Sequence, residues 1–322
     1  MRLRCEVFEP EAVAQAGVAV IIPARNEAER IGPCLDALAQ QDRQGCVIHV
    51  CVNNTDDATA EIVRDRARRH RLPLVLSELR LPRGGVGRAR RLGHLSAMRF
   101  SPGAASLLST DADCLAAPGW IAAMRAALER HPAVLGRIEG LDDLAPELLD
   151  KVRRGGRVED DYMRLSLEFA RLVSQGGSEA IGLNTAGGAN LGIRREIYRA
   201  VGGFRAMPCR EDRDLIDRVI AAGHLPGRVE GALIRASMRP EGRAPGGMAD
   251  KIAERLSGGG DGLDMALAPV AAMLSPASGG GALSRAQAAR DLPILAAHVE
   301  ALRRLNGHDE RRRYLSAAGN RG

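Results

Sequence analysis

Aromatic residues are scarce in this chain, and long apolar runs are missing from it. Only 2% of the 322 residues are Phe, Tyr or Trp, which leaves few rings on which bases could stack and argues against a nucleic-acid partner. No apolar run reaches the roughly 18 residues that span a bilayer. The first residues, 1–6, lack the apolar segment of a secretory signal. We therefore expect a cytoplasmic protein.

The six cysteines form no closely spaced pair. No C-x-x-C motif occurs, and the cysteines lie far apart along the chain. Zinc sites and disulfide frameworks both show characteristic cysteine spacings. We therefore expect reduced and mostly buried thiols, with neither a zinc site nor a disulfide framework.

Lysine is almost absent, so arginine carries nearly all of the positive charge. The net charge is +6, and Lys151 and Lys251 are the only lysines. Arginine binds phosphate through a planar fork of donors. The excess therefore fits a diphosphate ligand or peripheral contact with the inner face of a membrane. A GC-rich coding bias would give the same composition without a functional meaning.

Strand and helix patterns alternate along the first part of the chain. Apolar runs at 18–22, 47–52, 74–76 and 105–110 predict strands, and segments with helical spacing follow them. This alternation is typical of an α/β fold with a mainly parallel sheet flanked by helices. Beyond Pro240 the chain becomes rich in Gly and Pro. We expect a domain at 1–245 and a partly helical appendage at 246–322.

Short polar motifs predict where two helices begin. Asn26, followed three residues later by Glu29, is expected to cap the helix after the first strand. Asp57 is expected to start the next helix rather than to bind a ligand. Both segments directly follow predicted strands.

Polar residues gather at the carboxyl ends of three predicted strands, at 24–27, 53–57 and 111–113. Ligands of open α/β sheets bind beyond these ends. Asp111 and Asp113 are two residues apart, so an extended chain places them on the same side, where they can share a hard cation and a diphosphate. A solvated acidic turn is the plain alternative for an Asp-x-Asp triplet.

Four segments stand out together: IIPARNE at 21–27, VNNTDDAT at 52–59, DAD at 111–113 and Glu-Asp at 211–212. In this order and spacing they resemble the family 2 glycosyltransferases of GT-A fold. The Gly-rich stretch 84–93 and the GGAN segment at 187–190 are similar to further stretches of that family. The resemblance covers roughly residues 17–235. It implies a Rossmann-like GT-A sheet.

The resemblance also implies an activity. It predicts transfer of a hexose from a nucleoside diphosphate sugar to an acceptor hydroxyl, with inversion. A divalent metal, Mn²⁺ or Mg²⁺, would be held by Asp113, while Asp111 would contact the ribose. Asp212 matches the general base of the family, and Glu211 would orient or bind the acceptor. The plain alternative is that this acidic pair only stabilises a helix N-terminus.

The remaining site residues are carried over from the same motifs. We expect the donor nucleotide to be bound by Ala24, Arg25, Glu27, Asn53, Asp56, Arg90 and Asp111. We expect Gly188 and Asn190 to shape the pocket for the donor sugar or the acceptor, a tight turn being the alternative. Asn53 and Asn54 replace the usual aspartates, which leaves the preferred base open. No histidine is expected to bind the metal, and Arg239 is the polar residue nearest to where the family has one.

Two other functions stay open from the sequence. A nucleotidyltransferase also combines an α/β sheet with metal-binding aspartates, but it normally has a Gly-rich loop and a lysine after its first strand. A catalytically inactive nucleotide-binding scaffold is expected to lose Asp113 or Asp212, and both are present. The sequence assigns neither the acceptor nor an oligomeric state.

Overall fold

One mixed sheet forms the framework of the protein. The computed structural model describes residues 3–81, 85–174, 187–242, 246–258, 262–275 and 282–319. The strands within these residues are β1 (Leu3–Phe8), β2 (Val18–Ala24), β3 (Cys46–Asn53), β4 (Leu74–Leu79), β5 (Ser106–Ser109), β6 (Cys114–Ala116), β7 (Ala133–Gly140), β8 (Leu191–Arg194) and β9 (Gly227–Ala236). They form a single sheet in the order β1-β4-β3-β2-β5-β8-β7-β9-β6.

The chain divides into two compact units. The first unit comprises Met1–Asp143 and Ala186–Asp250, and the second comprises Leu144–Thr185 and Lys251–Gly322. The first unit holds the sheet and the helices α1 (Pro10–Gln15), α2 (Ile31–Ala39), α3 (Thr59–Arg69), α4 (Gly85–Phe100), α5 (Trp120–Leu128), α7 (Arg195–Ala200) and α8 (Glu211–Ala221). The second unit holds α6 (Pro146–Val173), α10 (Val270–Leu274), α11 (Arg285–Arg303) and α12 (His308–Gly319), and α9 (Met248–Leu256) runs from one unit into the other.

The predicted α/β fold is confirmed, and its four predicted strands make up the parallel part of the sheet. Strands β2, β3, β4 and β5 pair parallel to one another in the order β4-β3-β2-β5. Antiparallel pairs are added by strands that the sequence patterns do not reveal, such as β1 on β4 and β8 on β5. The sheet is therefore mixed, with its parallel centre where the sequence predicts it.

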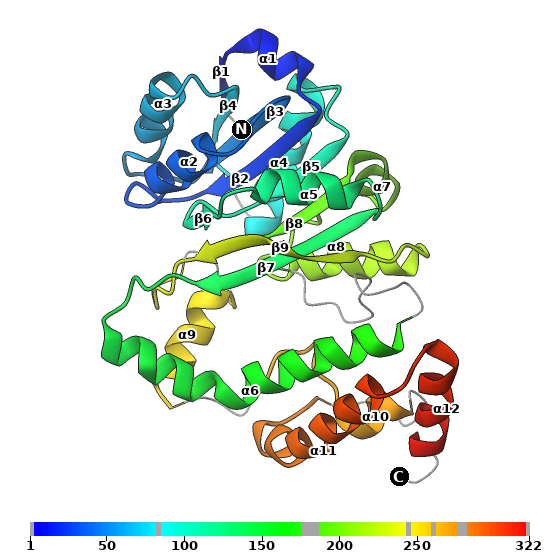
Figure 1. Ribbon diagram of the computed structural model, residues 1–322. Coiled ribbons are helices and arrows are strands. Elements are labelled where there is room, and N and C mark those ends of the chain that lie inside the picture. The colour runs from blue at the N-terminus through cyan, green and yellow to red at the C-terminus, as the bar shows by residue number, and fades with distance from the viewer. Residues whose placement is uncertain are drawn as a thin grey trace. The chain divides into compact units, whose positions relative to one another are not determined.

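The central strands are buried because helices cover both faces of the sheet (Figure 1). Every residue of β2 and β3 is buried, which explains their continuous apolar runs. On one face, Val20 and Ile22 of β2 share a core with residues of α2, α3 and α5. On the other face α4 lies so close that a Cβ at Gly93 would meet Ile21 at 2.6 Å.

The expected helix cap at Asn26 is wrong. Helix α2 begins only at Ile31, and no side chain caps it. Asn26 instead adopts a left-handed backbone with φ of 53°, and its side chain accepts a hydrogen bond of 2.9 Å from the amide of Asp56. It therefore joins the loop after β2 to the loop after β3. Helix α3 begins at Thr59 without a side-chain cap, and Asp57, two residues before it, accepts the amides of Thr59 and of Ala28, each at 3.0 Å.

The second unit has a core of its own. Apolar residues of α6, α10 and α11, together with neighbouring loop residues, form one buried cluster around Tyr162, Phe169 and Leu295. Helix α6, from Pro146 to Val173, is 28 residues long. The structure thus groups α6 with the C-terminal helices, and the expected boundary at 245/246 stays a prediction.

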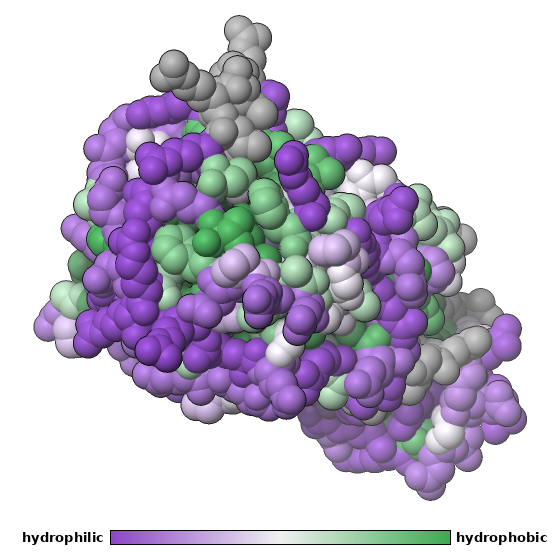
Figure 2. Space-filling view, turned by 90° about the horizontal axis from the view of Figure 1, so that it is seen from above, coloured by the Kyte–Doolittle hydropathy of each residue, from purple (hydrophilic) through white to green (hydrophobic). Residues whose placement is uncertain are grey.

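The surface is mainly hydrophilic, with one group of apolar residues near the centre of the face in Figure 2. Among the described helices, none combines the length and the apolar character needed to cross a bilayer. All six cysteines are free thiols, and four of them are buried, namely Cys34, Cys46, Cys51 and Cys114.

Candidate active site

The ends of β2 and β3 bring several predicted donor-binding residues together. The side-chain amide of Asn53 donates a 3.1 Å hydrogen bond to the carbonyl of Ala24, which ties the two strand ends to each other. Glu27 is buried, and its backbone amide donates to the hydroxyl of Thr59 at 2.8 Å. Arg25 is exposed beside them. Ala24, Arg25, Glu27 and Asn53 thus lie at one edge of the sheet.

Asp56 differs from these neighbours because its side chain points to solvent. Its carboxylate pairs with Arg80 at 2.6 Å, and the side chains of the two residues are 72% and 66% exposed. An ion pair this exposed contributes little to stability, about 0–1 kcal/mol. Its carboxylate is therefore free to exchange Arg80 for another partner.

Asp111 and Asp113 lie between β5 and β6, as the strand-end argument predicts. One oxygen of each carboxylate and the sulfur of Cys114 all lie within 4.8 Å of one another. Burial, together with the charge of Asp111, raises the pKa of the Asp113 carboxyl to about 6. Near neutral pH the Asp113 side chain is therefore still mostly a carboxylate.

These residues fit a hard divalent cation through oxygen rather than sulfur. Burial raises the pKa of the Cys114 thiol well above its ordinary value, so the sulfur stays protonated, and metals bind the thiolate. Carboxylate oxygens are the ligands that Mn²⁺ and Mg²⁺ accept, and diphosphate oxygens can complete the shell. Asp113, with Asp111 beside it, would hold the cation.

Arg90 is the centre of the site. It comes from α4 and is only 3% exposed. Its guanidinium donates to Asp111 at 2.5 Å, to Glu211 at 2.8 Å and to the hydroxyl of Ser109 at 2.7 Å. Burial alone would lower the pKa of this group, but the charges of Asp111 and Glu211 outweigh it and raise the pKa. Arg90 stays charged, and it joins the aspartate triplet to the acidic pair.

The acidic pair stands at the start of α8. Glu211 is 3% exposed, and burial raises the pKa of its carboxyl, although Arg90 acts in the opposite direction. Asp212 is less buried and accepts a hydrogen bond of 2.6 Å from the amide of Gly188. The two neighbours therefore differ: Glu211 is engaged with Arg90, whereas Asp212 lies at the edge of the site.

Gly188 and Asn190 are built into the protein framework. The carbonyl of Gly188 accepts from Arg90 at 2.9 Å. The side chain of Asn190 donates to the carbonyls of Arg137 and Ala232 and accepts from Trp120, each at 2.8 Å. Since these bonds use the whole amide of Asn190, this residue shapes the site through the backbone that it holds.

The Gly-rich start of α4 is explained by a close approach of two backbones. A Cβ at Gly87 would lie 2.4 Å from the carbonyl oxygen of Arg205, and one at Gly85 would lie 2.5 Å from the Cα of Pro208. The amide of Gly87 also donates to the carbonyl of Met207 at 3.2 Å. Glycine here lets α4 pack against the segment before α8. Residue 84 of the predicted stretch lies outside the described residues.

Arg239 is the residue whose importance the sequence conceals. It follows β9, and its guanidinium contacts the carboxylates of both Glu27 and Asp113. No motif marks it, and only its place near the expected metal ligand of the family gave a hint. Ser109 escapes notice for the same reason, because a serine within an apolar strand has no distinctive pattern.

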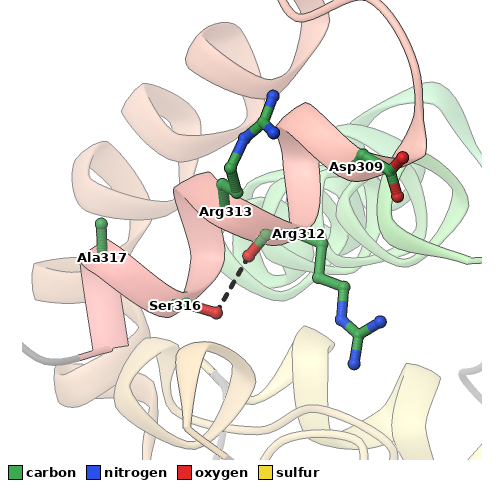
Figure 3. A pocket seen from close by; sticks show the side chains of 5 residues that line it. All are labelled: Asp309, Arg312, Arg313, Ser316 and Ala317. Atoms are coloured by element: carbon green, nitrogen blue, oxygen red, sulfur yellow. Dashed lines mark hydrogen bonds between the residues drawn. The ribbon is translucent and has the colours of Figure 1, made fainter.

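A hollow on the surface of α12 contains none of the predicted site residues. It is lined by Asp309, Arg312, Arg313, Ser316 and Ala317 (Figure 3). All five come from one helix, and the hydroxyl of Ser316 donates to the carbonyl of Arg312 at 3.1 Å. The strand-end cluster around Arg90 is therefore the stronger candidate for an active site.

Comparison with known proteins gives one family and several structures of the same fold. A family model described as Glycosyl transferase family 2 matches residues 19–201. The S. aureus TarS fragment 1-349 in complex with UDP-GlcNAc is 17% identical with a TM-score of 0.53, over 87% of this chain and 71% of that one. Mannosyltransferase PcManGT from Pyrobaculum calidifontis, in complex with GDP-Man and Mn²⁺, is 20% identical with a TM-score of 0.50, over 97% of this chain and 88% of that one.

The likeness to full-length TarS from S. aureus is partial. This structure is 18% identical with a TM-score of 0.52, and the match covers 74% of this chain but only 42% of that one. No protein with a curated description matches the chain. At such identities the structural matches establish the fold.

Proposed function

Because this chain belongs to glycosyl transferase family 2, we propose that it transfers a hexose from a nucleoside diphosphate sugar to an acceptor hydroxyl with inversion at the anomeric carbon. TarS and PcManGT carry nucleotide sugars in their structures, UDP-GlcNAc and GDP-Man respectively. These two ligands define the donor classes to test first.

The observation that supports this proposal is that Arg90 contacts carboxylates on both sides of the site. One guanidinium binds Asp111, on the donor side of the site, and Glu211, next to the proposed base. The carboxylates for the donor and for the acceptor therefore belong to one connected cluster. Transfer requires this proximity, since the attacking oxygen must reach the sugar while the diphosphate is still held.

Asp212 is the proposed general base. As the acceptor oxygen forms its bond to the anomeric carbon, the bond from that carbon to the diphosphate oxygen breaks, and the hydroxyl proton passes to the Asp212 carboxylate. The amide of Gly188 holds this carboxylate at 2.6 Å, so its position is fixed before the acceptor arrives. Glu211, engaged with Arg90, would position Asp212 and the acceptor rather than take the proton.

The donor would be held at the strand ends. Ala24, Arg25, Glu27, Asn53 and Asp56 would surround the base and the ribose, with Asp111 on the ribose side. A divalent cation at Asp113, when bound, would offset the negative charge that develops on the departing diphosphate. Arg90 would act on the donor through Asp111, because its guanidinium is buried among protein groups.

The direct test is a thermal-shift screen of nucleotide sugars with and without Mn²⁺. A ligand at 100 times its dissociation constant adds about 2.7 kcal/mol to the unfolding free energy. We expect stabilisation by a UDP-sugar or a GDP-sugar in the wild type, and its loss in Asp113→Asn. Stabilisation that is equal in both proteins would remove Asp113 from the donor site.

Product analysis then separates this activity from the two alternatives. A glycosyltransferase releases a nucleoside diphosphate from the nucleotide sugar, whereas a nucleotidyltransferase consumes a nucleoside triphosphate and releases pyrophosphate. A scaffold binds the nucleotide sugar and releases neither product. Detection of pyrophosphate, or of binding without release, would contradict the proposal.

A further inference from the structure

Arg239 forms ion pairs with two carboxylates of the candidate site. Its Nη1 donates to Glu27 at 2.8 Å and its Nη2 donates to Oδ2 of Asp113 at 2.8 Å, while Nη2 also contacts the second oxygen of Glu27. The Arg239 side chain is 12% exposed, and those of Glu27 and Asp113 are 7% and 21% exposed. The guanidinium is thus a largely buried part of the site.

The sheet determines where Arg239 lies. Strand β9 pairs antiparallel with β6, with Ala236 opposite Cys114. The next residue, Ser237, donates its amide to the carbonyl of Asp113 at 3.2 Å, and its hydroxyl donates to Asp143 at 2.5 Å. The amide of Arg239 then donates back to the Ser237 hydroxyl at 3.3 Å. This register brings the arginine to the aspartate by backbone pairing.

The guanidinium of Arg239 engages the same carboxylate that a divalent cation would use. The cation needs carboxylate oxygen from Asp113, and Oδ2 of that residue is already bound by Arg239. Two positive charges at one carboxylate repel each other, and the low dielectric of a largely buried site strengthens the repulsion. A guanidinium that leaves Asp113 has a suitable new partner in a diphosphate, which it binds through two parallel hydrogen bonds.

We propose, building on the proposed function, that Arg239 is the resident counter-cation of Asp113 and competes with the divalent cation for this carboxylate in the donor-free enzyme. The cation alone then binds weakly. It binds well only together with the donor, whose diphosphate accepts Arg239 in place of Asp113. Arg239 thereby makes binding of the cation depend on binding of the donor, and a cation without a donor seldom occupies the site.

The test is the affinity of the donor-free protein for Mn²⁺, measured from the electron paramagnetic resonance signal of free Mn²⁺. Arg239→Gln removes the charge but retains hydrogen-bond donors, and we expect it to bind Mn²⁺ about tenfold more tightly than the wild type. The double variant Arg239→Gln/Asp113→Asn should lose this gain, because the added affinity belongs to Asp113. An affinity that is unchanged or weaker in folded Arg239→Gln overturns the proposal.

Arg64 supplies a matched control. It also pairs with two carboxylates, those of Glu6 and Glu78, and its side chain is 15% exposed. Arg64→Gln removes the same charge at a place where none of the predicted site residues lies, so its affinity for Mn²⁺ should equal that of the wild type. A gain of equal size in Arg64→Gln would mean that net charge alone is responsible, and would overturn the assignment to Arg239.

A second substitution protects the test against misfolding. Arg239→Met is compared if Arg239→Gln shows no cooperative thermal unfolding, and the same tenfold gain is expected. No sugar donor enters the titration, so its result does not depend on transfer activity. If Mn²⁺ affinity rises in Arg239→Gln but the wild type transfers no sugar, the role of Arg239 stands and the proposed function is rejected. If the wild type transfers sugar but Mn²⁺ affinity does not rise in Arg239→Gln, the proposed function stands and the role of Arg239 is rejected.

Discussion

The amide of Gly188 donates a 2.6 Å hydrogen bond to the carboxylate of Asp212, while the carbonyl of the same glycine accepts one from Arg90 at 2.9 Å. A single peptide segment therefore connects the proposed base with the arginine at the centre of the site. Nothing in the spacing of these three residues along the chain suggests this contact. Through this contact the acidic pair and the GGAN segment both help to hold Arg90 and Asp212 in place.

Asp212→Asn is expected to bind the donor but not to transfer sugar. The amide oxygen of asparagine can still accept from Gly188, so the local structure survives, but the side chain no longer takes a proton at neutral pH. We expect transfer to fall by about 10²–10⁴-fold with little change in the donor dissociation constant. Rates of nucleoside diphosphate release and a donor titration measure the two quantities. Transfer within a factor of two of the wild type would exclude Asp212 as the base.

Gly188→Ala is expected to disrupt the site through Arg90. A Cβ at this position would lie 2.3 Å from Nη2 of Arg90, and the buried guanidinium has little room to move. Overpacking of this kind costs about 1–3 kcal/mol of unfolding free energy. Gly231→Ala is the matched control, since its Cβ would meet nothing within 4 Å. Chemical denaturation compares the two, and equal stabilities would contradict the predicted clash.

Arg90→Met is expected to be among the most destabilising changes in the first unit. It leaves Glu211, whose side chain is 4% exposed, without its cationic partner. Breaking a buried ion pair from one side costs about 3–5 kcal/mol. The double variant Arg90→Met/Glu211→Gln should recover part of this loss, because the uncompensated charge is then gone. A loss below about 1 kcal/mol in the single variant, typical of an exposed pair, would refute the burial argument.

Acid is expected to destabilise the first unit through His49 and His94. Burial lowers the pKa of both imidazoles to about 3. The unfolded chain binds these protons below pH of about 6.5 and the folded chain does not, so stability falls as the pH drops from about 6.5 toward 3. Between pH 6.5 and 5 each histidine removes about 2 kcal/mol. Denaturant unfolding at several pH values in this range measures the slope.

The variant His94→Phe isolates one of the two histidines. Asp113 acts in the opposite direction, because burial raises the pKa of its carboxyl to about 6 and the folded state therefore takes up that proton first. Because Asp113 is present in both proteins, its contribution cancels when the slope of the wild type is subtracted from that of the variant. We expect His94→Phe to be less sensitive to acid by about 2 kcal/mol over the same interval. Parallel pH profiles would show that His94 is not buried in its neutral form.

The sequence predicts the parallel centre of the fold well, for a physical reason. Strands covered on both faces are continuous apolar runs, and β2 and β3 show this pattern over their whole length. Strands such as β9 have a mixed burial pattern and are set by pairing with distant strands. Short-range patterns carry no information on such pairing, so the antiparallel part of the sheet was not predicted.

The same distinction applies to the site. Residues at the ends of predicted strands, such as Glu27 and Asp113, were located because parallel strands end at one edge of the sheet. The partners of these residues were not located, because Arg239 is 126 residues away from Asp113. Asn26 shows a related difficulty, since its residue type suits a helix cap and a left-handed turn equally well, and only the neighbouring loop decides between them.

The contact between α4 and the start of α8 has a consequence for the synthesis of the chain. Arg90 and Glu211 are 121 residues apart in sequence, and Gly87, on the same helix as Arg90, lies close to the backbone of Arg205. While the chain is being made, the strands around Arg90 emerge long before its carboxylate partner in α8. Asp111 follows Arg90 closely in the chain, but Glu211 is made 121 residues after Arg90, so the buried ion pair between Arg90 and Glu211 forms late in synthesis.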